Sequence, residues 1–183
     1  SEMASFHERL VSNKDNSITS IEAIYIPNDD ILDQGVQAIF PYLDSSVVLS
    51  RNIYQSGVLP AIDLLSSSSA NLNPAIVGEL HYEVALKALN LLKQATALDR
   101  TVSLVGESEL SKEDQLIYER SKKLRNFMTQ NFFVTENQTG KKGAYVPRQT
   151  TVEDVNDLLL GKYDNITDDK FSFIGSIKEI KNS

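Results

Sequence analysis

The sequence predicts an α/β segment followed by a helical bundle. Before about residue 66, short apolar runs alternate with turn residues, as they do around buried strands. After it, apolar residues recur every three or four positions over long stretches, which is typical of amphipathic helices. The polar stretch "SSSSANLNP", residues 66–74, separates the two patterns and is the predicted boundary between domains.

Two strands are predicted in the first part. The run "ITSIEAIYI", residues 18–26, is rich in β-branched residues and is closed by Pro27 and polar residues, so it reads as a buried strand entering a loop. The run "VVLS", residues 47–50, predicts a second short buried strand. One or two helical turns are expected over residues 51–56, ending at Gly57. The proline in "VLPAIDLL" favours an extended crossing after them.

Three helices are predicted in the second part. The first begins after Gly78 and carries an apolar stripe at Tyr82, Ala85, Leu89 and Leu92. The second begins at Ser111, where Ser111 and Asp114 resemble a capping box; its stripe is formed by Leu116, Ile117, Arg120, Leu124 and Phe127. The third is expected to start at Thr150 with Glu153 and to end at Gly161.

Composition excludes several classes of protein. The 183 residues carry a net charge of −7, which argues against a nucleic-acid binder. There is no cysteine, so disulfide and thiol chemistry are excluded, and no apolar run approaches the roughly 20 residues of a membrane helix. No signal peptide is visible. The chain opens "SEMASFHERL" without an initiator methionine, and we expect it to be a fragment.

Local motifs assign no catalytic residue and no metal ligand. The sequence contains no GxxxxGK[ST], GxGxxG, HExxH or GxSxG pattern. His7 and His81 have no partner at metal-ligand spacing, so structural or surface roles are expected for both. "DDILD", Asp29–Asp33, is open to interpretation as a carboxylate site, but a solvated loop after a strand explains it better.

Seven motifs follow one another in an order that resembles the carboxy-terminal part of the catalytic β subunit of F-type ATP synthase. The resemblance covers essentially the whole chain, and "AIYIPNDD" and "SELSKED" favour the β subunit over the α subunit. The motifs are "SITSIEAIYIPNDD" (17–30), "LDSSVVLSR" (43–51), "GVLPAID" (57–63), "IVGELHYEVA" (76–85), "SELSKED" (108–114), "FMTQNFFV" (127–134) and "GKYDN" (161–165).

The resemblance implies a division of the chain. Residues 1–75 would be the end of a RecA-like nucleotide-binding sheet, and residues 76–183 a carboxy-terminal helical domain. The family's phosphate loop, catalytic glutamate and Mg-linked aspartate would lie before this segment. ATP or ADP with Mg would therefore bind to the parent subunit, whereas this chain alone is expected to bind no nucleotide and to hydrolyse none.

The resemblance also implies an altered adenine pocket. The family's tyrosine is replaced by Leu59 in "GVLPA", one family phenylalanine is matched by Phe132, and the other is replaced by Gln138. Each lost aromatic contact removes stacking worth about 0.5–1.5 kcal/mol, so weaker and less base-selective binding is expected. Tyr25 matches a residue beside the catalytic site, although ordinary core packing also explains a tyrosine there.

Two further surfaces are implied by the resemblance. Arg51 and Tyr82 match the face that meets a neighbouring α-type subunit, with core packing as the alternative for Tyr82. "SELSKED" is similar to the acidic DELSEED element that meets the rotating γ-type shaft, but Ser108 and Lys112 replace acidic residues. A plain capped helix start is the alternative, and the two are compatible. The expected shaft contacts are Glu109, Leu110, Ser111, Lys112, Glu113 and Asp114.

These departures suggest a diverged bacterial paralogue. The expected partners are α-type subunits in an alternating ring and a γ-type shaft, in the cytoplasm and peripheral to the inner face of the cell membrane. The main alternative is a non-catalytic structural subunit of a similar ring. A free-standing helical adaptor fits less well, because the predicted strands would have no sheet to join.

Overall fold

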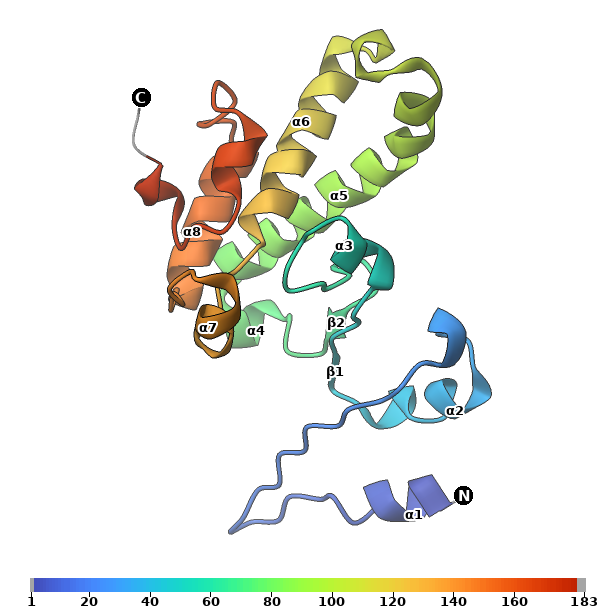
Figure 1. Cartoon of the computed structure of the whole chain (residues 1–183). Helices are drawn as coiled ribbons and strands as arrows, with labels where there is room; N and C mark the ends of the chain where they lie inside the picture. Colours follow the sequence, from blue (N-terminus) through green and yellow to red (C-terminus); the bar gives the residue numbers. More distant parts are fainter. Residues whose placement is uncertain (1, 181–183) are drawn as a thin grey trace. The chain divides into compact units, whose positions relative to one another are not determined.

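The computed structural model describes residues 2–180 and has the predicted class, an α/β segment followed by a mostly helical region (Figure 1). Its one small sheet within the described residues consists of β1 (Ser45–Ser46) and β2 (Ser68–Ser69). No helix among these residues is both long and apolar enough to cross a membrane.

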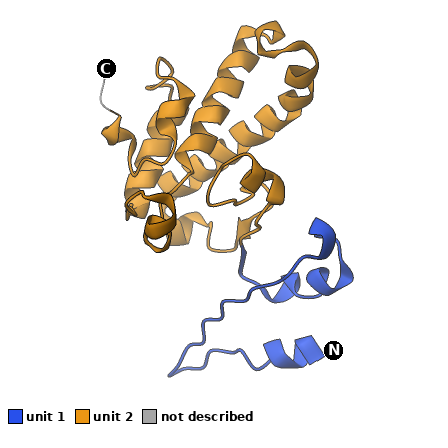
Figure 2. Cartoon of the chain, in the orientation of Figure 1, with its two compact units in different colours: residues 1–46 blue, residues 47–183 orange. Residues whose placement is uncertain are grey.

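Residue contacts divide the chain into two compact units, residues 1–46 and residues 47–183 (Figure 2). We call them unit 1 and unit 2 and describe each by itself. The division reflects where contacts between residues are dense, and it does not by itself define domains. The domain boundary predicted after residue 75 stays a prediction.

Unit 1 contains short helices and long extended segments. The expected strand at residues 18–26 is wrong for this chain, because the segment is extended but not paired with any described strand. Ile21 is 98% exposed and Tyr25 is 83% exposed. A strand needs a neighbour for its backbone N–H and C=O groups, and none is supplied here. The elements are α1 (Glu2–His7), η1 (Pro27–Asp29), α2 (Gln34–Gln37), η2 (Phe40–Tyr42) and β1.

The first part of unit 2 contains one short helix and an isolated strand bridge, with bends and turns between them. The buried strand expected at residues 47–50 is wrong, since Val47 and Leu49 are mostly exposed and Leu49 makes only an isolated antiparallel bridge to Ile62. The predicted helical turns are confirmed as α3 (Arg51–Gln55), and Gly57 follows with a φ of 80°. The polar connector contains β2 and leads into α4 (Pro74–Val77).

A helical hairpin dominates unit 2. The first predicted helix is confirmed as α5 (Glu79–Val105) and the second as α6 (Lys112–Phe127), with η3 (Glu107–Glu109) between them. The stripe expected on α5 is shifted: Leu92 is buried as expected, but the other buried residues are Val84, Leu91 and Ala95. On α6, Leu124 and Phe127 are buried, whereas Leu116 is exposed.

The third predicted helix is present as α8 (Arg148–Leu159), but it begins two residues earlier than Thr150. Pro147 occupies the N-cap position, and proline's fixed φ suits a helix entry, so no side-chain cap at Thr150 is needed. Short elements surround it: η4 (Phe133–Thr135), α7 (Glu136–Thr139), η5 (Asp168–Phe171) and η6 (Ile177–Glu179).

The core of unit 2 is shared by α5, α6 and α8, closed by the turns after α8. Burying such side chains is the main source of stability in a helical unit of this size. The cluster is formed by Val84, Leu91, Leu92, Leu124, Phe127, Val152, Val155, Leu158, Phe171 and Ile177.

Candidate functional site

The candidate adenine-side residues lie on two segments that are joined by a backbone hydrogen bond. The N–H of Gln130, three residues beyond α6, donates to the carbonyl of Leu59 at 2.8 Å. The side chain of Leu59 is 37% exposed. The stretch after α3 and the stretch after α6 therefore form one surface, although they are far apart in the sequence.

Phe132 and Gln138 belong to the second of these segments. Phe132 precedes η4 and is 42% exposed, and Gln138 is exposed on α7. The loop is held in shape by hydrogen bonds from Gly143 N–H to the Glu136 carboxylate (2.7 Å) and from Ala144 N–H to the Asn131 carbonyl (3.1 Å). Phe132 and Gln138 thus lie exposed on one hydrogen-bonded loop, and their contact with an adenine ring stays a prediction.

Close packing in this loop depends on Gly143. A Cβ atom at Gly143 would lie 2.5 Å from the backbone nitrogen of Phe133, so no other residue fits there without a shift of the backbone. The local sequence gave no reason to expect that approach.

Tyr25 is the one nucleotide-site candidate in unit 1, where its side chain is largely exposed. The core-packing alternative for Tyr25 does not hold within this unit. Its suggested role beside a nucleotide stays a prediction.

The second candidate site is the tip, residues 107–114, where α5 turns into α6. Gly106 ends α5 with a φ of 91°, and Leu110 is buried beneath the turn. Glu109, Lys112 and Glu113 are exposed on it. The tip therefore presents charged side chains on a turn that is anchored by one apolar residue.

Gln115 closes the tip, and sequence reasoning missed it. Its side-chain nitrogen lies within hydrogen-bond distance of three backbone carbonyls, those of Glu107 (3.4 Å), Ser108 (3.1 Å) and Leu110 (3.1 Å). These carbonyls follow the end of α5 and would otherwise face solvent or remain unsatisfied. A glutamine in a first helical turn was the only available signal, and it is a weak one.

The predicted cap at Ser111 is confirmed, with a different second bond. The Ser111 hydroxyl oxygen accepts from the Asp114 backbone N–H at 3.1 Å, as expected of an N-cap. The hydroxyl then donates to the Asp114 carboxylate at 2.7 Å, so this carboxylate braces the cap. Helix capping and an exposed tip thus coexist.

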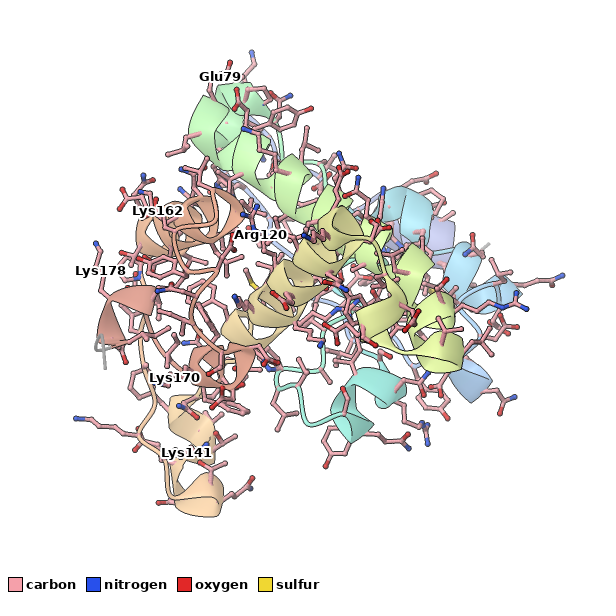
Figure 3. All side chains as sticks on the ribbon, turned by 90° about the horizontal axis from the view of Figure 1, so that it is seen from above. Glu79, Arg120, Lys141, Lys162, Lys170 and Lys178 are labelled. Carbon is pink, nitrogen blue, oxygen red and sulfur yellow. The ribbon has the colours of Figure 1, made fainter. Side chains whose placement is uncertain are left out.

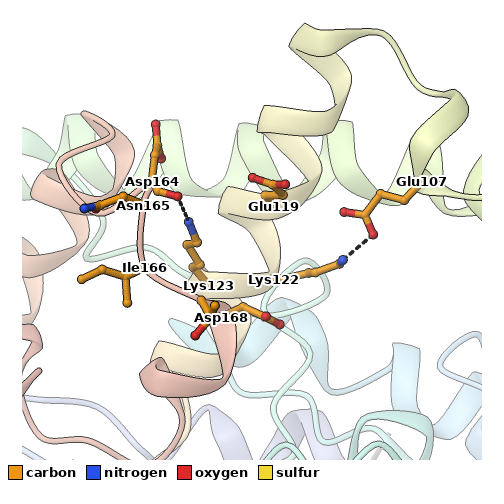
Figure 4. A pocket seen from close by; sticks show the side chains of 9 residues that line it. Glu107, Glu119, Lys122, Lys123, Asp164, Asn165, Ile166 and Asp168 are labelled. Carbon is orange, nitrogen blue, oxygen red and sulfur yellow. Dashed lines mark hydrogen bonds and ion pairs between the residues drawn. The ribbon is translucent and has the colours of Figure 1, made fainter. Parts of the chain in front are cut away.

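Behind the tip lies a hollow of about 250 Å³ with mixed charge, shown in Figure 4. Lys122 is paired with Glu107 at 2.5 Å. Lys123 is buried and donates to the carbonyls of Tyr163 (3.1 Å) and Asp164 (2.8 Å). The hollow is lined by Glu107, Glu119, Lys122, Lys123, Asp164, Asn165, Ile166, Thr167 and Asp168. Both lysines are occupied, so the hollow offers no unpaired cation.

In Figure 3, Lys178 points away from unit 2, whereas Arg120 lies inside it. Arg120 connects α6 to the turn after α8. Its guanidinium donates twice to the Asp164 carboxylate and once to the Leu159 carbonyl (3.1 Å). The hydrogen bond with Arg120 lowers the pKa of Asp164, against a smaller opposing effect of burial. This is a structural ion pair, and it explains the polar residue in the predicted apolar stripe.

The two interface candidates lie on different helices of unit 2. Arg51 is the first residue of α3 and is exposed; Tyr82 lies in the first turn of α5 and is half-buried. Their proposed contact with a neighbouring subunit stays a prediction. Residues 2–180 contain no group of three or more histidine or acidic side chains that could hold a metal ion.

Two family models match adjoining stretches of the chain. Residues 1–69 match the model described as "ATP synthase alpha/beta family, nucleotide-binding domain", and residues 71–157 match "C-terminal domain of V and A type ATP synthase". Each stretch is less than half of the 183 residues. Together they follow the order of the two parts that the sequence predicts.

Among solved structures, the chain is similar to the unique ATP synthase subunit NeqB from Nanoarcheaum equitans. The TM-score is 0.74 at 23% sequence identity, and the match covers 87% of this chain. At this identity the likeness concerns the fold. The match covers 38% of the length of NeqB.

Proposed function

The chain is related to the subunits of ATP synthases, and we propose that it is the carboxy-terminal part of a β-type subunit of an F-type-like rotary ATPase. In this role it supplies the adenine side of a nucleotide site and the tip that meets a rotating shaft. ATP or ADP with Mg binds to the whole subunit, whose phosphate-binding elements lie outside these residues.

The observation that carries the proposal is the path of α6. The helix starts at the capped tip and ends at Phe127, and three residues later Gln130 is hydrogen-bonded to Leu59 of the candidate pocket. Sixteen residues of helix span about 24 Å at 1.5 Å per residue. A stiff helix thus connects the candidate adenine pocket to the tip. Such a connection is needed if nucleotide binding is to displace the tip.

The hairpin is braced along its length. The Tyr118 hydroxyl on α6 donates to Asp99 on α5 at 3.1 Å. The ion pair between Lys122 on α6 and Glu107 in η3 joins α6 to the turn that follows α5. Packed helices transmit displacement because they have discrete packings and do not deform continuously. The proposal requires no net negative charge at the tip, since a rigid shape transmits force.

The pocket part is tested by restoring the missing aromatic residues. In the full-length subunit within its assembly, Leu59→Tyr and Gln138→Phe each add a stacking surface and should tighten ATP binding roughly two- to tenfold, from about 0.5–1.5 kcal/mol per contact. Leu160→Tyr, at the exposed residue that follows α8, is the matched control and should leave the affinity unchanged. Equal affinities in all variants would refute the assignment of Leu59 and Gln138.

The lever part is tested by softening α6. Replacing Leu116 and Glu119, both exposed, by glycine adds backbone freedom at the middle of the helix, whereas replacing both by alanine keeps the helix stiff. We expect the glycine pair to reduce shaft-coupled hydrolysis in the assembly and the alanine pair to preserve it. Equal loss in both would mean that the side chains, and not the stiffness, matter.

Two alternatives have support from specific observations. A V- or A-type subunit is favoured by the family match of residues 71–157. A non-catalytic ring subunit is favoured by Leu59 and Gln138, which leave the pocket with fewer aromatic walls. Copurification of the full-length subunit with its neighbours separates these: α-type and γ-type partners support the proposal, and V- or A-type partners refute it. Analysis of bound nucleotide before and after turnover then separates catalytic from structural sites.

The 183-residue chain by itself should show no ATP hydrolysis. It has no GxxxxGK[ST] loop to surround phosphates with backbone N–H groups, so the transferred phosphate has no cradle. The measurement is phosphate release by the purified chain with Mg and ATP. Turnover above that of a heat-denatured sample would contradict the prediction.

A further inference from the structure

In unit 1, three separate segments meet on one imidazole ring, that of His7. His7 is the last residue of α1; its Nε2 lies 3.1 Å from a carboxylate oxygen of Glu22, in the extended segment 18–26. The ring of Tyr42, in η2, is stacked on the imidazole with centroids 4.6 Å apart. We call His7, Glu22 and Tyr42 the clasp.

The hydrogen-bond partners of His7 fix its proton count. Nδ1 lies 2.8 Å from the carbonyl oxygen of Met3, which can only accept, so Nδ1 carries a proton. Nε2 faces a carboxylate, and an ionised carboxylate also only accepts. Both contacts are satisfied when a further proton lies between Nε2 and Glu22. If the imidazole were neutral with its proton on Nδ1, the lone pair of Nε2 would face a negatively charged oxygen of an ionised Glu22, with no proton between them.

Because His7 and Glu22 are largely shielded from solvent, the proton between them affects the stability of the clasp. The His7 side chain is 4% exposed and the Glu22 side chain 20% exposed, so water replaces a lost bond poorly. The second carboxylate oxygen of Glu22 is buried without a hydrogen-bond partner among the described residues. The hydrogen bond with Met3, followed by that with Glu22, raises the pKa of His7, and the cost of burial opposes this. Glu22 is the charged group that acts on the ring; Phe6, edge-on at 5.4 Å, and Tyr42 are its aromatic neighbours.

We propose that the clasp is a proton-operated latch, which holds α1 and segment 18–26 against η2 while His7 is protonated and releases them when the proton is lost. Because the folded-state pKa of His7 is raised, the stabilisation is present at pH values below the unfolded-state pKa. It is lost as the pH rises through the folded-state pKa. The latch does not depend on the function proposed above.

The first test is a nuclear magnetic resonance titration of the two histidines in the full 183-residue chain. His7→Gln identifies the His7 signal by its disappearance, and the His81 signal serves as an internal reference. The His7 midpoint should fall when Glu22 is replaced by Gln, while the His81 midpoint stays the same. A His7 midpoint that is indifferent to Glu22→Gln would overturn the proposal.

The second test measures release. The N–H groups of Glu8 and Leu10 donate to the carbonyls of Ala4 and His7, so their hydrogen-exchange protection factors report on α1. Between about pH 5.5 and pH 8.5, on either side of the ordinary histidine pKa of about 6.5, protection should fall about tenfold for each unit by which the pKa is raised.

His7→Gln is the control for the second test, because glutamine keeps a side-chain donor toward Glu22 but does not titrate in this range. Its protection factors should be the same at both pH values, and unchanged protection in α5 verifies that unit 2 stays folded. Equal protection at both pH values in the unmodified chain would overturn the proposal, as would the same fall in His7→Gln.

Discussion

At the scale of single residues, Arg120 joins α6 to the end of α8 and to the turn that follows it. Its planar guanidinium reaches both oxygens of Asp164 and a main-chain carbonyl at the end of α8. Gly161 makes room for it: a Cβ atom there would lie 2.1 Å from an Arg120 nitrogen, and the φ of 80° also requires glycine. One arginine and one glycine thus add a polar connection to the apolar packing between α6 and α8.

Arg120→Ala should lower the free energy of unfolding by about 2 kcal/mol, because hydrogen bonds to charged groups contribute the most and Asp164 would lose its partner. Arg125→Ala, on the same helix, is the control. Its contact with Asp99 is long, at 3.9 Å, and both side chains are more than a third exposed, so little change is expected. Urea denaturation measures both, and equal losses would show that Arg120 is unimportant.

The same pair predicts a dependence on pH. The pKa of Asp164 is lowered in the folded chain, so its stabilisation is present above the unfolded-state pKa and is lost as the pH falls through the folded-state pKa. The difference in unfolding free energy between the unmodified chain and Asp164→Asn should therefore shrink on acidification from about pH 7 to pH 3. A difference that grows over this range would contradict the assigned sign.

At the scale of elements, caps and glycines account for the boundaries that were predicted correctly. Ser111 caps the start of α6, Gly57 follows α3, and Gly78 precedes the start of α5. Each signal acts within a few residues of the chain, so it can be read locally. The start of α8 was placed two residues late because Thr150 has the chemistry of a cap, whereas Pro147 provides the entry without a side-chain bond.

Ser111→Ala should destabilise the chain by about 1 kcal/mol through loss of the N-cap. It should also speed amide exchange in the first turn of α6, since the Asp114 N–H loses its acceptor. Ser108→Ala, three residues earlier in η3, is the matched control and should change neither quantity appreciably. Thermal denaturation and hydrogen exchange give the two measurements, and an equal effect of both substitutions would count against the cap.

At the scale of the whole molecule, two different kinds of order are present. Unit 2 has a shared apolar core, which ten buried side chains from three helices and two turns form. Unit 1 leaves large side chains such as Ile21 and Tyr25 exposed on an extended segment. Backbone N–H and C=O groups of an extended segment without a paired neighbour are suited to pairing with a further strand.

Hydrogen exchange should therefore separate the two units. Amides of residues 18–26 have no strand partner within residues 2–180 and should exchange quickly, whereas those of Leu91 and Leu92 in α5 should be among the slowest. In the full-length subunit, residues 18–26 should gain protection and α5 should change little. Fast exchange of residues 18–26 in both contexts would contradict the expected pairing.

The sequence by itself determined the class of the fold, the long helices and the cap of α6, because helical periodicity and capping act over a few residues. It also determined, through the order of its motifs, the relation to ATP synthase subunits. It mispredicted the buried strands at residues 18–26 and 47–50, since a strand exists only with a neighbour.

Only the tertiary structure decided the contacts between distant residues. These are Gln115 closing the tip, Arg120 reaching Asp164, Gln130 joined to Leu59, and His7 meeting Glu22. Each of these pairs polar groups that must be satisfied once they leave water, and the partner is chosen by packing, not by spacing in the sequence.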